Sequence, residues 1–267
     1  MSKKRASPGD DEIKPPEISE AHSKLLTELE DEHSRLVIAD QFASLYKLIP
    51  FYKKRNESLK TIDKFWLRAL QNHGAFVSLY GNHTEDLEAL KYLENMWVER
   101  FEPDPRAFRL EMHFKENPFF TNTVLSKTYS LKTPPSGAVI NGIYESMLKF
   151  NPDLDLVISS SGISWRNDKV NLCKKFPAPK SLAGEEDELM DADLGSFFNF
   201  FDTNTDESDL GPALASDFFS EPIPFFKGEI DDDESFDEEE DDDDSIDEDS
   251  DAEEIDLERP KKRAKRA

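Results

Sequence analysis

Residues 108–131 read FRLEMHFKENPFFTNTVLSKTYSL. The first eight of these residues alternate apolar and polar side chains, which is the pattern of a β-strand with one buried face. Pro118 ends that pattern, because proline cannot donate to a strand ladder. Residues 124–131 are rich in β-branched and aromatic side chains and predict a partner strand. This stretch therefore predicts an antiparallel hairpin with a phenylalanine-bearing loop.

Two further strands are expected on the C-terminal side, at residues 154–159 and 163–172. Residues 133–153 carry prolines and glycines and read as an insertion between strands, with a short helix around 144–150. The aromatic density of the later sequence argues for burial, and Ser196 suits a helix N-cap there. We expect a further short helix at 209–219 and the end of the fold near Phe226.

A long helix is predicted on the N-terminal side, from Ile18 to Lys60. Its apolar or small residues recur at intervals built from threes and fours, which places them on one seam. The seam consists of Ile18, Leu25, Leu29, Leu36, Ala39, Ala43 and Tyr46. Such a helix would be roughly 65 Å long, about twice the width of a small domain. A second copy of the same helix is the simplest cover, so we predict a homodimer; packing inside a monomeric bundle is the alternative. Pro50 should kink the helix.

Residues 61–79 and 84–101 read as two shorter, aromatic-rich helices between the long helix and the hairpin. With the predicted strands, they define an α+β fold class. The expected architecture is a long N-terminal dimerisation helix, then a four-stranded antiparallel sheet with helices, then a disordered acidic C-terminal tail.

The charge of the chain is strongly negative, −25 over 267 residues. Residues 229–258 hold 21 acidic side chains in 30 positions, and six basic residues follow directly. Such a tail offers too little apolar surface to fold alone. Residues 1–228 hold 37 acidic and 27 basic side chains, a net charge of −10. A protein with this charge attracts basic partners and repels nucleic acid, so sequence-specific nucleic-acid binding is not expected.

Other functional classes lack their signals. The five histidines are scattered, and Cys173 is the one cysteine, so neither a metal site nor a disulfide within the chain is predicted. No phosphate-binding glycine loop, nucleophile elbow or paired Cys-x-x-Cys occurs, so we expect neither a cofactor nor an enzyme. The polar N-terminus shows no signal peptide, and no stretch reaches transmembrane length, so no membrane association is expected.

The basic end of the chain reads as a nuclear localisation signal, and the nucleus, with shuttling to the cytoplasm, is the expected compartment. The five basic residues assigned to the signal are Lys261, Lys262, Arg263, Lys265 and Arg266. The alternative is a basic terminus that folds back on the neighbouring acidic run.

Several motifs together resemble the nucleosome assembly protein family, especially its branch of SET (template-activating factor) proteins. They include residues 50–55 (PFYKKR), Phe65-Trp66, residues 114–122 (FKENPFFTN), Ile163-Ser164-Trp165, residues 196–202 and residues 209–226. The resemblance spans about residues 18–228 in the order of the family. It departs at residues 62–66, where Asp63 replaces a proline of the family pattern, and at 133–153, where the insertion looks longer than in SET proteins.

The resemblance implies a long dimerisation helix that carries an α+β domain, the earmuff. It also implies core histones as partners, either the tetramer-forming pair or the flanking dimer pair, bound on an acidic lower surface of that domain. The positions here that correspond to this surface are Asp202, Asp206, Glu207, Asp209, Asp217 and Glu221. The implied function is that of a histone chaperone, which assists nucleosome assembly and disassembly.

Three alternatives remain open at this point. SET proteins are associated with phosphatase inhibition, so a regulatory inhibitor of a serine/threonine phosphatase is one. A scaffold for a histone acetyltransferase is another, and an acidic ribosome-biogenesis factor is the third. The predicted organisation is a disordered N-terminal tail (1–17), a dimerisation helix (18–60), an earmuff domain (61–228, with the insertion at 133–153 and an acidic linker at 177–195), an acidic tail (229–258) and a basic localisation segment (259–267).

Overall fold

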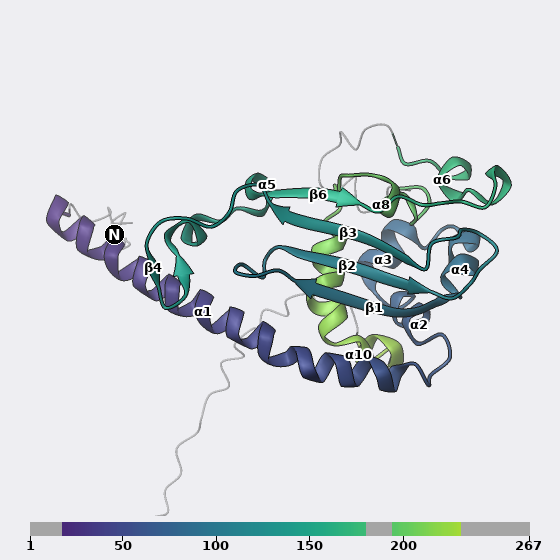
Figure 1. Ribbon diagram of the computed structural model, residues 1–267, viewed down its shortest axis with the longest axis horizontal. Helices are drawn as coiled ribbons and strands as arrows, with labels where there is room; N and C mark the ends of the chain where they lie inside the picture. The colour runs from purple at the N-terminus through teal and green to yellow at the C-terminus, as the bar shows by residue number, and fades with distance from the viewer. Residues whose placement is uncertain (1–17, 180–193, 231–267) are drawn as a thin grey trace, which may run out of the picture. The chain divides into compact units, whose positions relative to one another are not determined.

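The computed structural model describes residues 18–179 and 194–230 (Figure 1). The predicted N-terminal tail, most of the predicted linker, the acidic tail and the basic localisation segment lie outside the described residues.

Helix α1 runs from Glu20 to Leu59, close to the predicted bounds. It begins at Ser19, whose hydroxyl accepts a hydrogen bond from the His22 amide at 3.2 Å and so caps the first turn. The helix continues through Pro50 without ending there. Its 40 residues give a rod of about 60 Å.

The segment after α1 is more broken than its sequence suggested. The first predicted helix is divided into α2 (Phe65–Leu70) and α3 (Gly74–Tyr80). The second was wrong in its C-terminal half: α4 spans only Thr84–Leu90, and strand β1 follows at Leu93–Arg100. A register irregularity between Leu93 and Asn95 disturbs the alternation in β1. The buried Leu93 and Met96 are three residues apart, a spacing that also occurs in helices, and this hid the alternation that continues from Met96 to Val98.

The sheet has four antiparallel strands in the order β1-β2-β3-β6. The predicted hairpin is confirmed as β2 (Phe108–Phe114) and β3 (Val124–Leu131), and the prediction for 154–159 as β6 (Leu156–Ser160). The strand predicted at 163–172 was wrong. That segment makes one isolated bridge, between Phe120 and Trp165, and then forms two short helices.

The asparagine side chains at the start of those two helices explain the difference. Asn167 caps η2 (Asp168–Val170) and Asn171 caps α6 (Leu172–Lys175), each by accepting a backbone N–H two or three residues later. Capping of this kind competes with extended structure.

Helices cover one face of the sheet and form the main core with it (Figure 1). Every second residue of β2, from Phe108 to Phe114, is buried on this side. The opposite face is half-exposed and polar: Arg109 forms an ion pair with Glu111 there, and His113 Nε2 lies within hydrogen-bond distance of the same carboxylate, at 3.1 Å. The sheet thus has a buried and a polar face, as its alternation predicted.

The FKENPFFTN motif forms most of the loop that connects β2 and β3. Asn117 is buried, and its side-chain oxygen accepts the amides of Phe119 and Phe120, both at 3.0 Å. Phe120 then enters an aromatic cluster with Trp165 and Phe198. The motif therefore stabilises the fold.

The insertion at 133–153 contains a second, two-stranded hairpin of β4 (Val139–Ile140) and β5 (Ile143–Tyr144). Asn141 and Gly142 both have positive φ, as a type I′ turn requires. A 3₁₀ turn, η1 (Glu145–Lys149), and helix α5 (Pro152–Asp155) follow; η1 lies in the region where a short helix was expected.

This insertion packs on the chain's own long helix. Ile143 and Met147 form a small buried cluster with Phe42 of α1, separate from the main core. The guanidinium of Arg106 lies over the Phe42 ring and donates to the Met147 carbonyl at 3.0 Å.

The C-terminal elements are α8 (Asn199–Asp202), α9 (Leu210–Ala213), the π-helical turn η3 (Leu214–Phe218) and α10 (Pro222–Lys227). Ser196 does not directly precede a helix, because α8 begins three residues later; its hydroxyl still accepts the Phe198 amide at 3.2 Å, as a capping side chain does, and it donates to Asp86 at 2.7 Å. The short helix expected at 209–219 corresponds to α9 and η3. Among the described helices, none is long and apolar enough to cross a membrane.

Candidate functional site

The six predicted surface carboxylates lie on the C-terminal helices and their loops. Five are exposed, and Asp206 is half-buried. Asp202 ends α8, and the loop from Thr203 to Ser208 carries Asp206 and Glu207. Asp209 is the N-cap of α9, Asp217 lies in η3, and Glu221 is the N-cap of α10.

The structure divides these six residues into two groups. The first, which we call the strand-side group, is Asp202, Asp206, Glu207 and Asp209, and its loop is bonded to β3. The second, the helix-side group, is Asp217 and Glu221, on the segment bonded to α1 and β1. Because β2 lies between β1 and β3, the two strands that anchor these groups are about 10 Å apart.

A buried lysine holds the loop of the strand-side group. Lys127 of β3 is fully buried, and its ammonium donates to the carbonyls of Phe200 at 2.5 Å, Thr203 at 3.1 Å and Thr205 at 2.6 Å. Three donors meet three acceptors, so the ammonium is satisfied without bulk water. Burial lowers the pKa of Lys127 to about 8, and the charge of Asp206 acts in the opposite direction.

Asp206 is bound by its own chain. One carboxylate oxygen accepts the Tyr129 hydroxyl at 2.5 Å and the Gly211 amide at 2.8 Å, and the other accepts the Leu210 amide at 3.2 Å. Burial and then Asp206 raise the pKa of Tyr129 well above its usual range, so the hydroxyl stays a donor. The Asp206 side chain therefore joins the loop to the sheet and to the start of α9. The side chains of Glu207 and Asp209 make no such bonds.

Asp153 adds to the strand-side group, and sequence reasoning missed it. The pKa of Asp209 is raised by burial, by Asp206 and by Asp153 of α5. Asp153 is exposed. The insertion thus brings a further carboxylate to the same acidic region.

The helix-side group is anchored by two arginines. Arg55 of α1 donates to the carbonyls of Phe219 at 2.6 Å and Ser220 at 3.0 Å, and its guanidinium lies 4.7 Å from the centre of the Phe219 ring. Arg100 of β1 donates to the Ala215 carbonyl at 2.8 Å. These bonds hold η3 and the start of α10, and with them Asp217 and Glu221, against the rod and the sheet.

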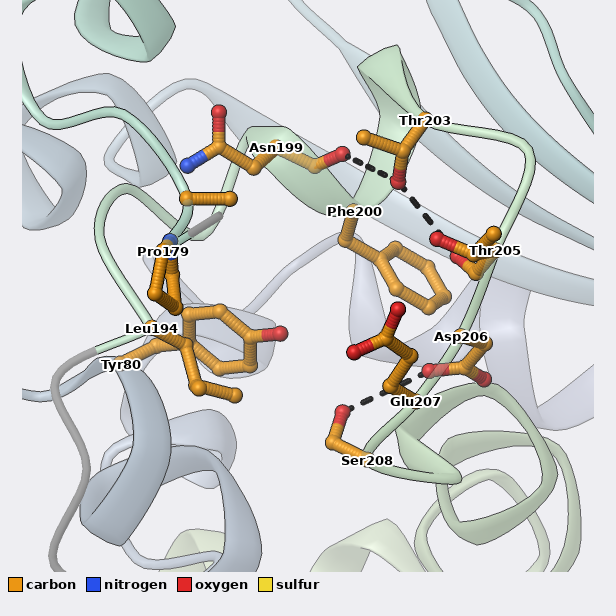
Figure 2. Close-up of a pocket in the computed structure, with 11 residues that line it drawn as sticks. Tyr80, Pro179, Leu194, Asn199, Phe200, Thr203, Thr205, Asp206, Glu207 and Ser208 are labelled. Atoms are coloured by element: carbon orange, nitrogen blue, oxygen red, sulfur yellow. Dashed lines mark hydrogen bonds between the residues drawn. The ribbon is translucent and has the colours of Figure 1, made fainter. Parts of the chain in front are cut away.

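A cavity of about 160 Å³ opens beside the strand-side group (Figure 2). Its apolar walls include Tyr80 at the end of α3, Phe200 of α8, Leu194 and Pro179. The loop from Thr203 to Ser208 forms the polar side. Figure 2 shows the Tyr80 hydroxyl and the Glu207 carboxylate pointing toward one another across the cavity.

The predicted dimerisation seam is exposed in its N-terminal half. Ile18, Leu25, Leu29 and Leu36 are 51–53% exposed in the single chain. In the C-terminal half, Ala39 and Tyr46 are half-buried against the insertion cluster around Phe42, and Ala43 is exposed. The insertion therefore flanks the seam, and part of what looked unpartnered in the sequence has a partner in the same chain.

No cluster of histidine, cysteine or carboxylate side chains suited to a metal ion occurs among residues 18–179 and 194–230. His73 is buried, and its Nδ1 accepts the Phe76 amide at the start of α3. Cys173 is buried, and burial raises the pKa of its thiol to about 12, which disfavours the thiolate.

The family model for nucleosome assembly protein (NAP) matches residues 50–258. Together with the rod, the four-stranded sheet and the covering helices, this match shows that the chain belongs to the NAP family. The resemblance to this family that was inferred from the sequence is thereby confirmed.

Relatives from several organisms agree with that assignment. Protein SET of Drosophila melanogaster is 28% identical over 179 residues, which cover 66% of this chain and 60% of the relative. Nucleosome assembly protein 1-like 4 of Mus musculus is 30% identical over 233 residues, 78% of this chain and 57% of the relative. The chain thus spans about 60% of the length of these curated relatives. None of these matches indicates an enzyme family.

Solved structures show the same fold. Ccp1 superposes with a TM-score of 0.55 at 22% identity and covers 79% of this chain and 97% of its own. The Vps75 histone chaperone superposes with a TM-score of 0.51 at 16% identity and covers 79% of this chain and 100% of its own. The expected α+β architecture is therefore confirmed.

Proposed function

We propose that this chain is a histone chaperone that binds core histones through its acidic surface and acidic tail. Membership of the NAP family supports the class of function, and the name of the Vps75 relative supports the cargo. The observation that carries the proposal is the rigid mounting of exposed carboxylates. Lys127 and Tyr129 hold the loop that presents Glu207 and Asp209 to solvent.

The mechanism is competition by charge. Histones bind DNA by displacing counterions from phosphates, an interaction that weakens steeply with salt. A carboxylate surface can neutralise the positive charge of a basic protein much as DNA phosphates do. The 21 acidic residues of 229–258 add negative charge and increase the association rate. The chaperone would release its cargo when nucleosomal contacts outcompete it.

The proposal includes a homodimer. Four large apolar side chains of the seam are about half-exposed on a rod of about 60 Å, and antiparallel pairing of two rods would cover them. It also includes the nucleus as the working compartment, on the strength of the basic segment at 259–267. A dimer would present two acidic surfaces to one histone assembly.

The test measures the affinity of the full chain for each core histone pair at two salt concentrations. The triple variant Asp202→Asn/Glu207→Gln/Asp209→Asn should weaken binding roughly tenfold at low salt, since each exposed charge contributes up to about 1 kcal/mol. Deletion of 229–258 should weaken it further and reduce the salt dependence.

The matched control is Glu57→Gln/Asp63→Asn/Glu88→Gln, which removes the same charge from exposed positions outside both acidic groups. It should leave affinity within about twofold of the unaltered chain, because distant exposed charges are screened. Undiminished histone binding by a chain with both the triple substitution and the tail deletion would contradict the electrostatic account.

A further inference from the structure

The cavity beside the strand-side group has the lining of a site for one long cationic side chain. Its volume of about 160 Å³ is room for roughly five water molecules, enough for a guanidinium and part of the methylene stem that carries it. Tyr80 and Phe200 supply aromatic walls, and both side chains are otherwise buried. Aromatic faces attract cations, arginine most often.

Glu207 supplies the uncompensated charge. Its carboxylate points into the cavity, and it makes no hydrogen bond or ion pair with any described residue (Figure 2). Asp206 also lines the cavity, but Tyr129, Leu210 and Gly211 already occupy its oxygens. The free acceptor in the cavity is therefore Glu207, with the Thr203 and Thr205 side of the loop beside it.

The buried Lys127 opposes a cationic guest, so its effect must be weighed. Its ammonium lies 4.4 Å from the centre of the Phe200 ring. Its donors are directed to three carbonyls, and the neighbouring Asp206 carries the opposite charge. Because Lys127 and Asp206 offset one another, Glu207 leaves the cavity with a net negative charge.

We propose that this cavity is an anchor site for one arginine side chain of the basic cargo. The guanidinium would lie against the aromatic wall and pair with Glu207, while its stem contacts Leu194 and Pro179. This inference rests on the proposed function, since the cargo is the histone assigned there. It adds one contact that fixes the position of the histone on the acidic surface, which charge attraction alone would not do. A planar fork of donors is better suited than an ammonium to the carboxylate and to the hydroxyls of the loop.

Two variants separate the cavity from the general acidity of the surface. Glu207→Gln removes the charge, and Thr205→Phe adds bulk at the lining without altering net charge, because Thr205 is exposed, lines the cavity and bonds Lys127 by its carbonyl. Each should weaken histone binding at least fivefold, and Asp63→Asn, which removes an exposed charge elsewhere, should change it less than twofold. A Thr205→Phe chain that unfolds like the original and binds histones equally well would overturn the proposal.

A small probe tests the site without histones. Acetyl-arginine-amide, titrated into the full chain, should shift the NMR amide signals of Thr205, Glu207 and Ser208 and should not do so in Glu207→Gln. Acetyl-citrulline-amide has the same shape without charge and should cause no such shift. Shifts from arginine in a chain that binds no histone would support the anchor site and refute the proposed function; equal shifts from both probes, or from neither, would refute the anchor site alone.

Discussion

The Tyr129 hydroxyl donates a hydrogen bond of 2.5 Å to the carboxylate of Asp206. This bond links the buried face of β3 to the loop that carries the strand-side group. Asp206, which was expected on the histone-binding surface, is thus bonded to a residue of the core. Its contribution to binding is to position the neighbouring carboxylates.

Tyr129→Phe should therefore weaken both the fold and the surface. Removal of the hydroxyl leaves a partly buried carboxylate with one donor fewer, which should lower the free energy of unfolding by about 1–3 kcal/mol. Histone affinity should fall as well, because the loop becomes mobile. Urea denaturation and histone titration measure the two effects. Tyr92→Phe is the control, since the Tyr92 hydroxyl has no partner among the described residues; an equal loss in both variants would contradict the role of the bond.

Lys127 makes stability depend on pH in a definite direction. Its pKa is about 8 in the folded chain against 10.5 for an unperturbed lysine, so between these values the unfolded chain binds more protons. Stability contributed by this site must then rise as pH increases from about 8 toward 10.5. The difference in unfolding free energy between the original chain and Lys127→Met should grow in favour of the original over this window.

Urea titrations at pH 7.5, 9 and 10 measure that difference directly, because titrations common to both chains cancel. The exposed Lys115→Met provides the reference and should show no comparable slope. A flat difference for Lys127→Met would mean that the ammonium is not desolvated as the structure indicates.

The seam of α1 allows a sharp test of dimerisation. Leu29→Glu/Leu36→Glu places two charges on the exposed apolar face, and burial of four such charges in a paired rod is unfavourable by several kcal/mol. The variant should sediment as a monomer with an unaltered circular dichroism spectrum in the sheet region. Ser23→Glu/Thr27→Glu adds the same charge to the other side of the helix, because residues two positions apart, such as Leu25 and Thr27, point about 200° apart around the helix axis. This control variant should remain dimeric. A monomeric original chain at micromolar concentration would end the dimer proposal.

Arg55 should not tolerate lysine. Its guanidinium serves two carbonyls and the Asn56 side chain at once and lies against the Tyr52 and Phe219 rings. An ammonium cannot reproduce these contacts, so Arg55→Lys should lower the free energy of unfolding by about 1–3 kcal/mol. Chemical denaturation measures the loss, and the exposed Lys53→Met should cause little; a neutral Arg55→Lys would show that the guanidinium contacts with Phe219 and Ser220 do not stabilise the fold.

The sequence predicted the regular parts of this fold because their periodicity extends over most of each element. The rod and the β2–β3 hairpin were both predicted nearly to the residue. Strand β1 was missed because the irregularity after Leu93 disturbs its alternation. The hairpin in the insertion had a readable signal, Asn141-Gly142, which was overlooked.

The candidate site was less predictable, because it depends on contacts between distant segments. The six carboxylates could be named from the sequence, but not their division into two groups or the internal role of Asp206. One feature of the sequence did indicate how the loop is anchored: Lys127 lies between Leu125 and Tyr129 on the inward side of an alternating strand. A charged residue at such a position must find partners inside the protein.

The insertion has a mechanical consequence. Helix α1 is fastened to the domain at Arg55 and again, more than three turns earlier, where Phe42 meets Ile143 and Met147. Two attachment points prevent the helix from rotating relative to the domain about either one. In the proposed dimer, the distance between the two acidic surfaces would then be constant, because it is set when each chain folds. Cargo would be selected by whether it is long enough to contact both surfaces.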